Sequence, residues 1–269
     1  MHGRSATVPQ PGQSAADVIE QRAALWQRKP LTREVYRRYF GMIERELSPG
    51  VGGGVAPVTI EIGGGSGMSR EFLRGVTVTD VVPSPHVDLV ADAMQLPFAE
   101  ASVDNLFMVD VLHHLPYPAR FFREAARVLR RPPHAGRLVM LEPYISPMSR
   151  LVFRLAHPEP VDLSIDPLPA GDEALFDSSE GRGGAFASNQ AIPTLLFRRH
   201  AARFSAQFPE LRIRTNRLES CFAYPLSGGF SGPNIVPRLL FPLVFAIEGA
   251  LSPLGPLLAF RILVTLERT

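Results

Sequence analysis

An acid and three glycines follow a short apolar run at regular spacing. Residues 58–67 read VTIEIGGGSG, which places Glu61, Gly63, Gly65 and Gly67 at every second position. Glycine lets the backbone approach a ligand closely, and the free N–H groups of a turn at a helix start can bind polar groups. A strand, a glycine turn and a helix in this order are typical of nucleotide-like binding sites. The stretch therefore predicts a cofactor loop beside a carboxylate.

The glycine spacing disfavours a dinucleotide site. A dinucleotide fingerprint needs glycine at its first, third and sixth positions. Counted from Gly63, the sixth position is Met68, which is too large for close helix packing. The only lysine, Lys29, precedes the loop, so the domain has no Tyr-x-x-x-Lys pair. An NAD-dependent reductase is therefore the less favoured alternative.

Short β-branched runs must position this loop. The runs that we predict as strands are 58–62, 76–81, 87–91, 105–111, 136–143, 211–220 and 259–268. Helical patterns lie between several of them; residues 118–130 place Phe121, Phe122 and Ala125 on one face with arginines opposite. Strands alternating with helices indicate βαβ units and a parallel sheet.

Composition narrows the class of protein. The chain has 269 residues, 45% of them hydrophobic and 20% charged, with a net charge of +2, as in an ordinary globular protein. No basic stripe indicates nucleic-acid binding. The single cysteine, Cys221, excludes an internal disulfide, and no zinc spacing is present. With no apolar core near the N-terminus, this favours a cytoplasmic protein. We expect a disordered tail over 1–20, a helical cap over 21–50 and one domain over 51–269.

Four motifs over residues 58–144 together resemble class I S-adenosylmethionine-dependent methyltransferases of the small-molecule branch (type 11). The acid-x-Gly-x-Gly-x-Gly spacing is similar to motif I of that family, and Asp80 ends the second strand as the family's ribose-binding acid does. ADAMQLPF over 91–98, LHHL over 112–115 and GRLVMLEPY over 136–144 match the later motifs. The resemblance implies a Rossmann-like, doubly wound α/β fold. Its seven-stranded, mostly parallel sheet would have an antiparallel last strand, with a lid insertion at about 145–190 after the fifth strand.

The resemblance also implies a cofactor, S-adenosylmethionine, and a set of residues that bind it. In the family's pattern Glu61 orients the loop and the cationic end of the cofactor. Asp80 accepts hydrogen bonds from both ribose hydroxyls, and Asp92 accepts from the adenine amino group. The positions carried over as cofactor-binding are Glu61, Gly63, Gly64, Gly65, Gly67, Asp80, Val81, Asp92, Ala93, Met94, Asp110 and His114.

The expected reaction is methyl transfer to a small molecule, with no nucleic-acid partner. A hydroxyl acceptor needs a base at or after transfer. The candidates are His114, Asp110 and His157, with Glu142, Tyr144 and Glu159 as further choices. Adjacent His113 and His114 would project about 100° apart on a helix, so we expect no metal site. A non-catalytic S-adenosylmethionine-binding partner protein is the alternative from another class.

The apolar segment at about 236–258 has several interpretations. Pro242, Glu248, Pro253 and Pro256 interrupt it, which argues against a membrane span of about twenty residues. It could pack as a helix on the sheet, or touch a membrane or a lipid-linked acceptor. We favour a third interpretation, a roof over the site shared with the 145–190 insertion. The sequence leaves the acceptor atom and the oligomeric state open.

Overall fold

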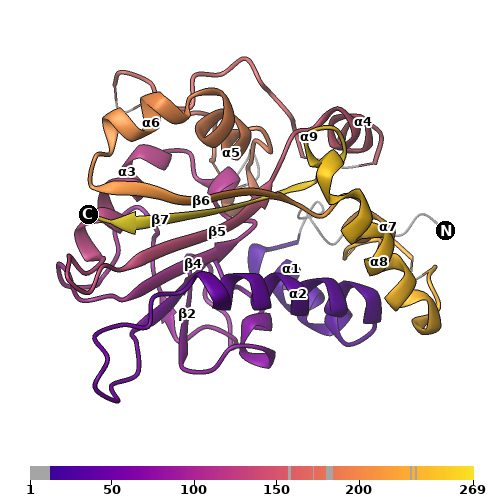
Figure 1. The fold of residues 1–269 in the computed structure, drawn as a ribbon, viewed down its shortest axis with the longest axis horizontal. Helices are drawn as coiled ribbons and strands as arrows, with labels where there is room; N and C mark the ends of the chain where they lie inside the picture. Colours follow the sequence, from indigo (N-terminus) through magenta and orange to yellow (C-terminus); the bar gives the residue numbers. More distant parts are fainter. Residues whose placement is uncertain (1–12, 157–158, 172, 180–183, 231, 234) are drawn as a thin grey trace.

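The structure is a computed structural model that describes residues 13–156, 159–171, 173–179, 184–230, 232–233 and 235–269. A twisted sheet forms its centre, and helices cover both faces (Figure 1). The predicted disordered tail over 1–20 falls mostly on residues 1–12, which lie outside the described residues. Helix α1 nevertheless begins at Ala15, because Ser14 caps it and forms a capping box with Asp17.

Seven strands form one sheet in the order β3-β2-β1-β4-β5-β7-β6. Their bounds are Thr59–Ile62 (β1), Val76–Asp80 (β2), Leu89–Val90 (β3), Asn105–Val109 (β4), Arg137–Pro143 (β5), Leu211–Glu219 (β6) and Arg261–Arg268 (β7). Strands β1 to β5 pair in parallel, and β7 lies antiparallel between β5 and β6. The predicted doubly wound fold with an antiparallel last strand is confirmed. Strand β3 is shorter than the predicted 87–91, since only Leu89 and Val90 pair with β2.

Alternating side chains of the central strands divide the core into two layers. Leu106 and Met108 of β4 face one side of the sheet, and Phe107 faces the other. The first side packs against α3 (Pro118–Val128) and the run of α5 (Ile192–Thr194), η5 (Leu195–Arg199) and α6 (Ala201–Gln207). The second side packs against α2 (Pro30–Glu46), and Trp26 at the end of α1 (Ala15–Trp26) belongs to the same layer of the core.

The segment after the glycine loop differs from the prediction. No α-helix follows the loop; residues Met68–Glu71 form a single 3-10 turn, η1. Gly67 enters it with φ of 65°, and the chain reaches β2 only five residues after the turn ends, at Val76. The N-terminal helix α2 instead covers the neighbouring sheet face through Val35, Phe40 and other buried residues. The chain therefore returns to the sheet without a long helix behind the loop.

The remaining helices lie mainly at the end of the sheet where the parallel strands finish. They are α4 (Pro147–Ala156), α7 (Ala223–Leu226), η6 (Arg238–Leu240), α8 (Phe241–Leu251), η7 (Ser252–Leu254) and α9 (Gly255–Leu258). Figure 1 shows α4, α7, α8 and α9 together at the right, opposite the C-terminus. Two short 3-10 turns, η2 (Leu112–His114) and η4 (Gly184–Phe186), complete the described elements.

Candidate active site

A cavity of about 490 Å³ opens at the carboxyl ends of β1, β2 and β4. That volume is ordinary for a small-molecule site, and this edge of an α/β sheet is where ligands bind. Its floor is the glycine loop, and its walls come from the ends of β2 and β4 and from residues 91–94. Residues of α1, α2 and the 145–190 insertion close it.

The glycine loop is a cradle that side chains could not occupy. Gly63 has φ of 68°, and a Cβ there would lie 2.4 Å from Val111 Cγ2. Gly65 has φ of 30°, and its N–H donates to Asp80 Oδ2 at 2.9 Å. Only glycine adopts such backbone readily and leaves the peptide open toward the cavity. The shape fits a ligand that lies on backbone.

Glu61 is buried beneath the loop. Its carboxylate accepts a hydrogen bond from Ser69 Oγ, and its backbone carbonyl accepts one from Thr79 Oγ1 at 2.7 Å. Burial raises the pKa of Glu61 to about 7, although the Ser69 hydrogen bond lowers it. A positive ligand group in the cavity would stabilise the ionised form. Glu61 therefore supports the loop, and its carboxyl group would ionise when a cationic ligand group lies beside it.

Asp80 and Asp92 lie at two corners of the same wall. Asp80 Oδ1 accepts from the N–H of Val82 at 2.8 Å, so its carboxylate links the end of β2 to the loop. Asp92 is exposed, and its Oδ1 accepts from the Met94 N–H at 2.8 Å. Each of these oxygens keeps a second lone pair for a ligand donor.

All of the predicted cofactor residues except Gly67 line the cavity. Gly67 shapes the turn instead, since its N–H donates to the carbonyl of Gly64 at 2.7 Å. Gly67 is therefore a positioning residue, and its predicted ligand contact is not supported by the geometry. Val81 is 55% exposed at the rim, where it can lie against a flat ring.

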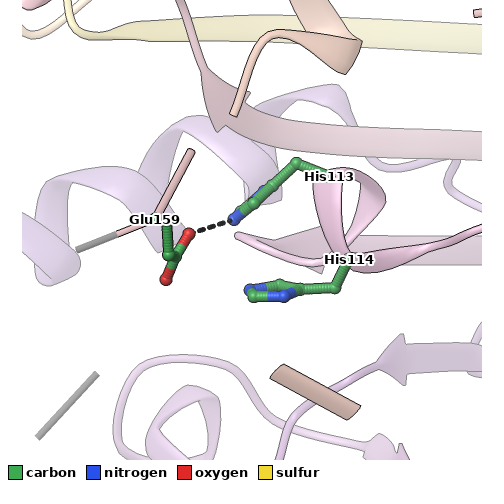
Figure 2. A group of neighbouring side chains, drawn as sticks. All are labelled: His113, His114 and Glu159. Atoms are coloured by element: carbon green, nitrogen blue, oxygen red, sulfur yellow. Dashed lines mark ion pairs between the residues drawn. The ribbon is translucent and has the colours of Figure 1, made fainter. Parts of the chain in front are cut away.

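His113, His114 and Glu159 form a cluster at the side wall of the cavity (Figure 2), and Glu142, which does not line the cavity, pairs with His113. His113 Nδ1 lies 2.8 Å from Glu142 Oε2, and its Nε2 lies 3.4 Å from Glu159 Oε2. Burial lowers the pKa of His113, but the hydrogen bonds to both glutamates outweigh it and raise the pKa to about 10. His113 is thus a cation between two carboxylates at neutral pH. It forms part of the frame and cannot serve as a base there.

His114 faces the cavity in a different state. Its Nδ1 lies 3.0 Å from the carbonyl oxygen of Ala187, an acceptor, so Nδ1 carries the proton and Nε2 keeps a lone pair. Burial and the neighbouring His113 charge lower the pKa of His114 to about 4. The two rings lie 4.2 Å apart, and Figure 2 shows both on one turn facing Glu159. His114 is therefore a neutral acceptor at the wall.

The other candidate bases have structural partners or lie elsewhere. Asp110 lines the cavity in left-handed backbone, with φ of 58°, and forms a buried ion pair with Arg261. Protonating Asp110 would leave that arginine uncompensated, so Asp110 is poorly suited to be a base. Glu142 and Tyr144 do not line the cavity, whereas Glu159 does. His157 lies outside the described residues.

The sequence reasoning missed the residues that close the cavity. They are Ile19, Arg22, Tyr36, Phe40, Phe153, Phe186, Tyr224, Phe230 and Arg261. Aromatic residues at helical spacing in α2 look like ordinary core, and most of them are also core. The described residues of the 236–258 segment are absent from the lining. The favoured interpretation of that segment as a roof over the site is therefore wrong.

His113, His114 and Glu159 could also offer ligand atoms to a metal, since one atom from each lies within 4.8 Å of the others. The proton on His113 already balances charge between its two glutamates. The cluster is thus satisfied by its own hydrogen bonds. The expectation that the site uses no metal stays a prediction.

The fold and this site resemble those of class I S-adenosylmethionine-dependent methyltransferases. A family described as "Methyltransferase domain" matches residues 60–134, the segment that carries the loop and both strand-end acids. A solved S-adenosylmethionine-dependent methyltransferase from Archaeoglobus fulgidus has the same fold, with a TM-score of 0.50 and 12% identity over 88% of this chain and 94% of that one. S-adenosylmethionine is the cofactor of this class, and the carboxylates and the glycine cradle fit it.

Two further proteins show similarity. A 50-residue stretch is 46% identical to 27-O-demethylrifamycin SV methyltransferase of Amycolatopsis mediterranei; it spans 19% of this chain and 17% of that relative's length. The structure of geranyl diphosphate C-methyltransferase from Streptomyces coelicolor aligns with 14% identity and a TM-score of 0.47, over 100% of this chain and 91% of that one.

The affinity for S-adenosylmethionine should rise with pH through about 7. Glu61 has its pKa raised from 4.5 to about 7, so it gains its charge in that window and then attracts the cationic cofactor. The free protein should lose stability across the same window, because the folded state binds the proton more tightly than the unfolded state. Glu61→Gln should flatten both profiles, as measured by calorimetric titration and thermal melting. A pH slope that persists in Glu61→Gln would assign the effect to another group.

Asp80→Ala should weaken S-adenosylmethionine binding by roughly tenfold or more, since hydrogen bonds to a charged group contribute about 1.5–3 kcal/mol each. Part of the loss would come through the loop, because Asp80 also accepts from the Gly65 N–H. Adenosine with and without its ribose hydroxyls separates the two effects. Wild type should prefer adenosine to 2',3'-dideoxyadenosine, and Asp80→Ala should not. Equal preference in both proteins would remove Asp80 from the ribose site.

Proposed function

We propose that this protein transfers the methyl group of S-adenosylmethionine to a small, largely apolar molecule. The observation that carries the proposal is the two-part lining of one cavity. Carboxylates and glycines from the ends of β1 and β2 line one part, and Phe153, Phe186, Tyr224 and Phe230, which come from other segments of the chain, supply the apolar part. A polar cofactor suits the first part, and an apolar acceptor suits the second.

When bound, the cofactor would supply an electrophilic methyl group: the acceptor's nucleophile bonds to the methyl carbon as the bond to the positively charged sulfur breaks, and the sulfur leaves as a neutral thioether. The chain contributes orientation and a low-dielectric enclosure, which can account for much of the rate. His114 Nε2 accepts a hydrogen bond from the O–H or N–H of the acceptor and so orients its lone pair. Because the acceptor becomes a strong acid as the new bond forms, a base with a pKa of about 4 suffices to take its proton. Glu159 pairs with His113 and lies beside both histidines, so it helps to hold the two rings in place.

The alternative of a non-catalytic cofactor-binding protein lacks such support. The neutral acceptor nitrogen of His114 at the cavity wall, beside an apolar lining that suits an acceptor, favours the enzyme over this alternative. The acceptors in the names of the two enzymes mentioned above are substrates of those enzymes and are not assigned to this chain. For this chain the aromatic residues that line the cavity limit the acceptor to an apolar class of small molecule; they do not specify the molecule or the atom that is methylated.

His114→Asn tests the proposal. An asparagine amide can donate to the Ala187 carbonyl as Nδ1 does, but it cannot place an acceptor where Nε2 lies. We expect methyl transfer to fall roughly 100-fold or more, a typical contribution of a positioned acid or base, with cofactor affinity within about threefold. The assay follows tritiated methyl from S-adenosylmethionine into the organic phase of a cell extract. Full transfer by His114→Asn would remove His114 from the reaction, and no transfer by wild type into any extract would overturn the proposed function.

A further inference from the structure

The apolar segment between β6 and β7 presents most of its surface to solvent. Arg238–Leu258 has a mean hydropathy of 1.5, yet only 11% of its apolar stretch is buried. Leu239, Leu243 and Ile247 are 88%, 55% and 44% exposed, and their spacing of four residues places them on one stripe. A helix that is apolar all round normally lies inside a protein or in a membrane. This segment is therefore without a partner on its outer side.

Helix α4 extends the same surface. Its exposed residues Met148, Leu151 and Leu155 follow helical spacing, and α4 packs against α9. Leu257 of α9 and Leu254 at the end of η7 are exposed as well. Figure 1 shows α4, α9 and α8 next to one another at the end of the molecule. We call this surface the apolar end face and define it by Met148, Leu151, Leu155, Leu239, Leu240, Leu243, Ile247, Leu254 and Leu257. Apolar surface gathered in this way marks an interaction site.

The charges of the apolar end face have one sign. Arg150, Arg154 and Arg238 are exposed on its elements. The one acid within α4 and residues 238–258 is Glu248, and it points inward. Its carboxylate accepts hydrogen bonds from the backbone N–H groups of Cys221, Phe222 and Ala223 at 2.7, 3.0 and 3.0 Å. Exposed leucines edged by arginines, with no outward acid, complement a surface that is apolar inside and anionic at its boundary.

By length and composition this helical stretch could cross a membrane, but its surroundings argue against a span. Directly after α9 the chain enters β7, an inner strand of the sheet between β5 and β6. The inner side of α8 is held to the same domain by Glu248 and by Phe245, whose ring lies 3.7 Å from the Arg38 guanidinium carbon. Both ends of the segment thus return to one folded unit. The segment can lie in a membrane surface but cannot pass through it.

We infer that the apolar end face docks the protein on the surface of an anionic lipid bilayer. The end face also adjoins the cavity: Phe153 of α4 lines the cavity while Leu151 and Leu155 of the same helix point outward. A docked molecule would therefore hold its cavity close to the bilayer. If the proposed function holds, the acceptor belongs to the apolar molecules that partition into lipid; this consequence rests on that function, whereas docking does not.

Vesicle co-sedimentation without cofactor or acceptor tests the inference. The probes are phosphatidylcholine vesicles with and without about a quarter phosphatidylglycerol. Wild type should pellet with the anionic vesicles, with roughly fivefold less protein on neutral ones, because the arginines contribute attraction. The Leu239→Ser, Leu243→Ser, Ile247→Ser triple variant should stay in the supernatant. Arg150→Glu with Arg154→Glu should lose the preference for anionic vesicles.

Matched controls are an exposed valine and an exposed arginine away from the face. Val55→Ser removes a side chain that is 63% exposed in the 51–57 loop, and Arg74→Glu reverses an exposed charge before β2. Both should pellet as wild type does. Wild type that remains in solution with both vesicles, or a triple variant that pellets fully, would overturn the inference. So would a stable dimer in sedimentation velocity that the triple variant converts to monomer, since a second copy would then cover the face. Titration of each variant with S-adenosylmethionine shows separately whether the domain is folded and the cofactor site intact.

Discussion

Gly65→Val should abolish S-adenosylmethionine binding while leaving the protein folded. The backbone of Gly65 has φ of 30°, which a β-branched residue adopts only with strain, and a Cβ there would lie 3.3 Å from Asp80 Oδ2. The valine would also break the Gly65 N–H bond to Asp80 and fill the cradle. We expect at least roughly a 100-fold loss of affinity, because strain, a lost charged hydrogen bond and steric exclusion act together.

Gly53→Val is the matched control for Gly65→Val. Gly53 also has a positive φ, of 66°, but a Cβ there would meet nothing within 4 Å. It therefore bears similar backbone strain far from the cavity. Calorimetric titration should show near wild-type affinity for Gly53→Val and none for Gly65→Val. Equal loss in both would show that backbone strain alone, rather than the cradle, accounts for the effect.

Glu142→Ala should strongly destabilise the fold. Glu142 is 1% exposed, and its Oε1 accepts from the N–H groups of Val111 and Leu112 at 2.8 and 2.9 Å. Its Oε2 pairs with His113. Removing the carboxylate leaves two buried donors and a buried cation poorly compensated, which typically costs about 3–5 kcal/mol. The melting temperature should fall by roughly ten degrees for a chain of this size.

Glu100→Ala provides the comparison for Glu142→Ala. Glu100 forms an exposed ion pair with Arg131, so its loss should cost less than about 1 kcal/mol.

The pH dependence of the stability difference between wild type and Glu142→Ala is a second check. His113 has its pKa raised from 6.5 to about 10, so its stabilisation is complete below 6.5 and is lost as the pH rises through 10. The gap between wild type and Glu142→Ala should shrink over that window. A gap that is constant with pH would mean that the His113 pair contributes little.

The sheet was predictable because its signals are local. Alternating β-branched runs predict the strands. The family resemblance, carried by the loop, Asp80 and residues 112–115, implies how these strands are arranged in the sheet. The short 3-10 turn after the loop was not predictable in this way. Whether residues 68–75 form a helix depends on what covers that sheet face, and α2 from the N-terminus covers it through contacts such as Phe40 with Phe72, whose rings are 5.6 Å apart.

The acids and glycines of the site could be predicted from the sequence, but the aromatic residues that close the cavity could not. Tyr36, Tyr224 and Phe230 come from distant segments and meet only in the fold, with Tyr36 and Phe230 rings 6.0 Å apart. The charge states of the histidines also depend on tertiary contacts. Composition suggests a buried or roofing role for the 236–258 segment, yet α8 buries only one stripe, which includes Val244. The direction a helix faces is set by its neighbours, so a segment that is apolar all round does not reveal it.

Calorimetric titration of the wild-type protein with S-adenosylmethionine, in parallel with NADH, tests the central claim most directly. We expect one site for S-adenosylmethionine, because the cradle from Gly63 to Gly65 and the carboxylates of Glu61 and Asp80 fit that ligand. We expect no binding of NADH, because the loop lacks the third glycine that a dinucleotide requires. A folded protein that binds NADH, or that gives no heat and no melting shift with S-adenosylmethionine, would contradict it.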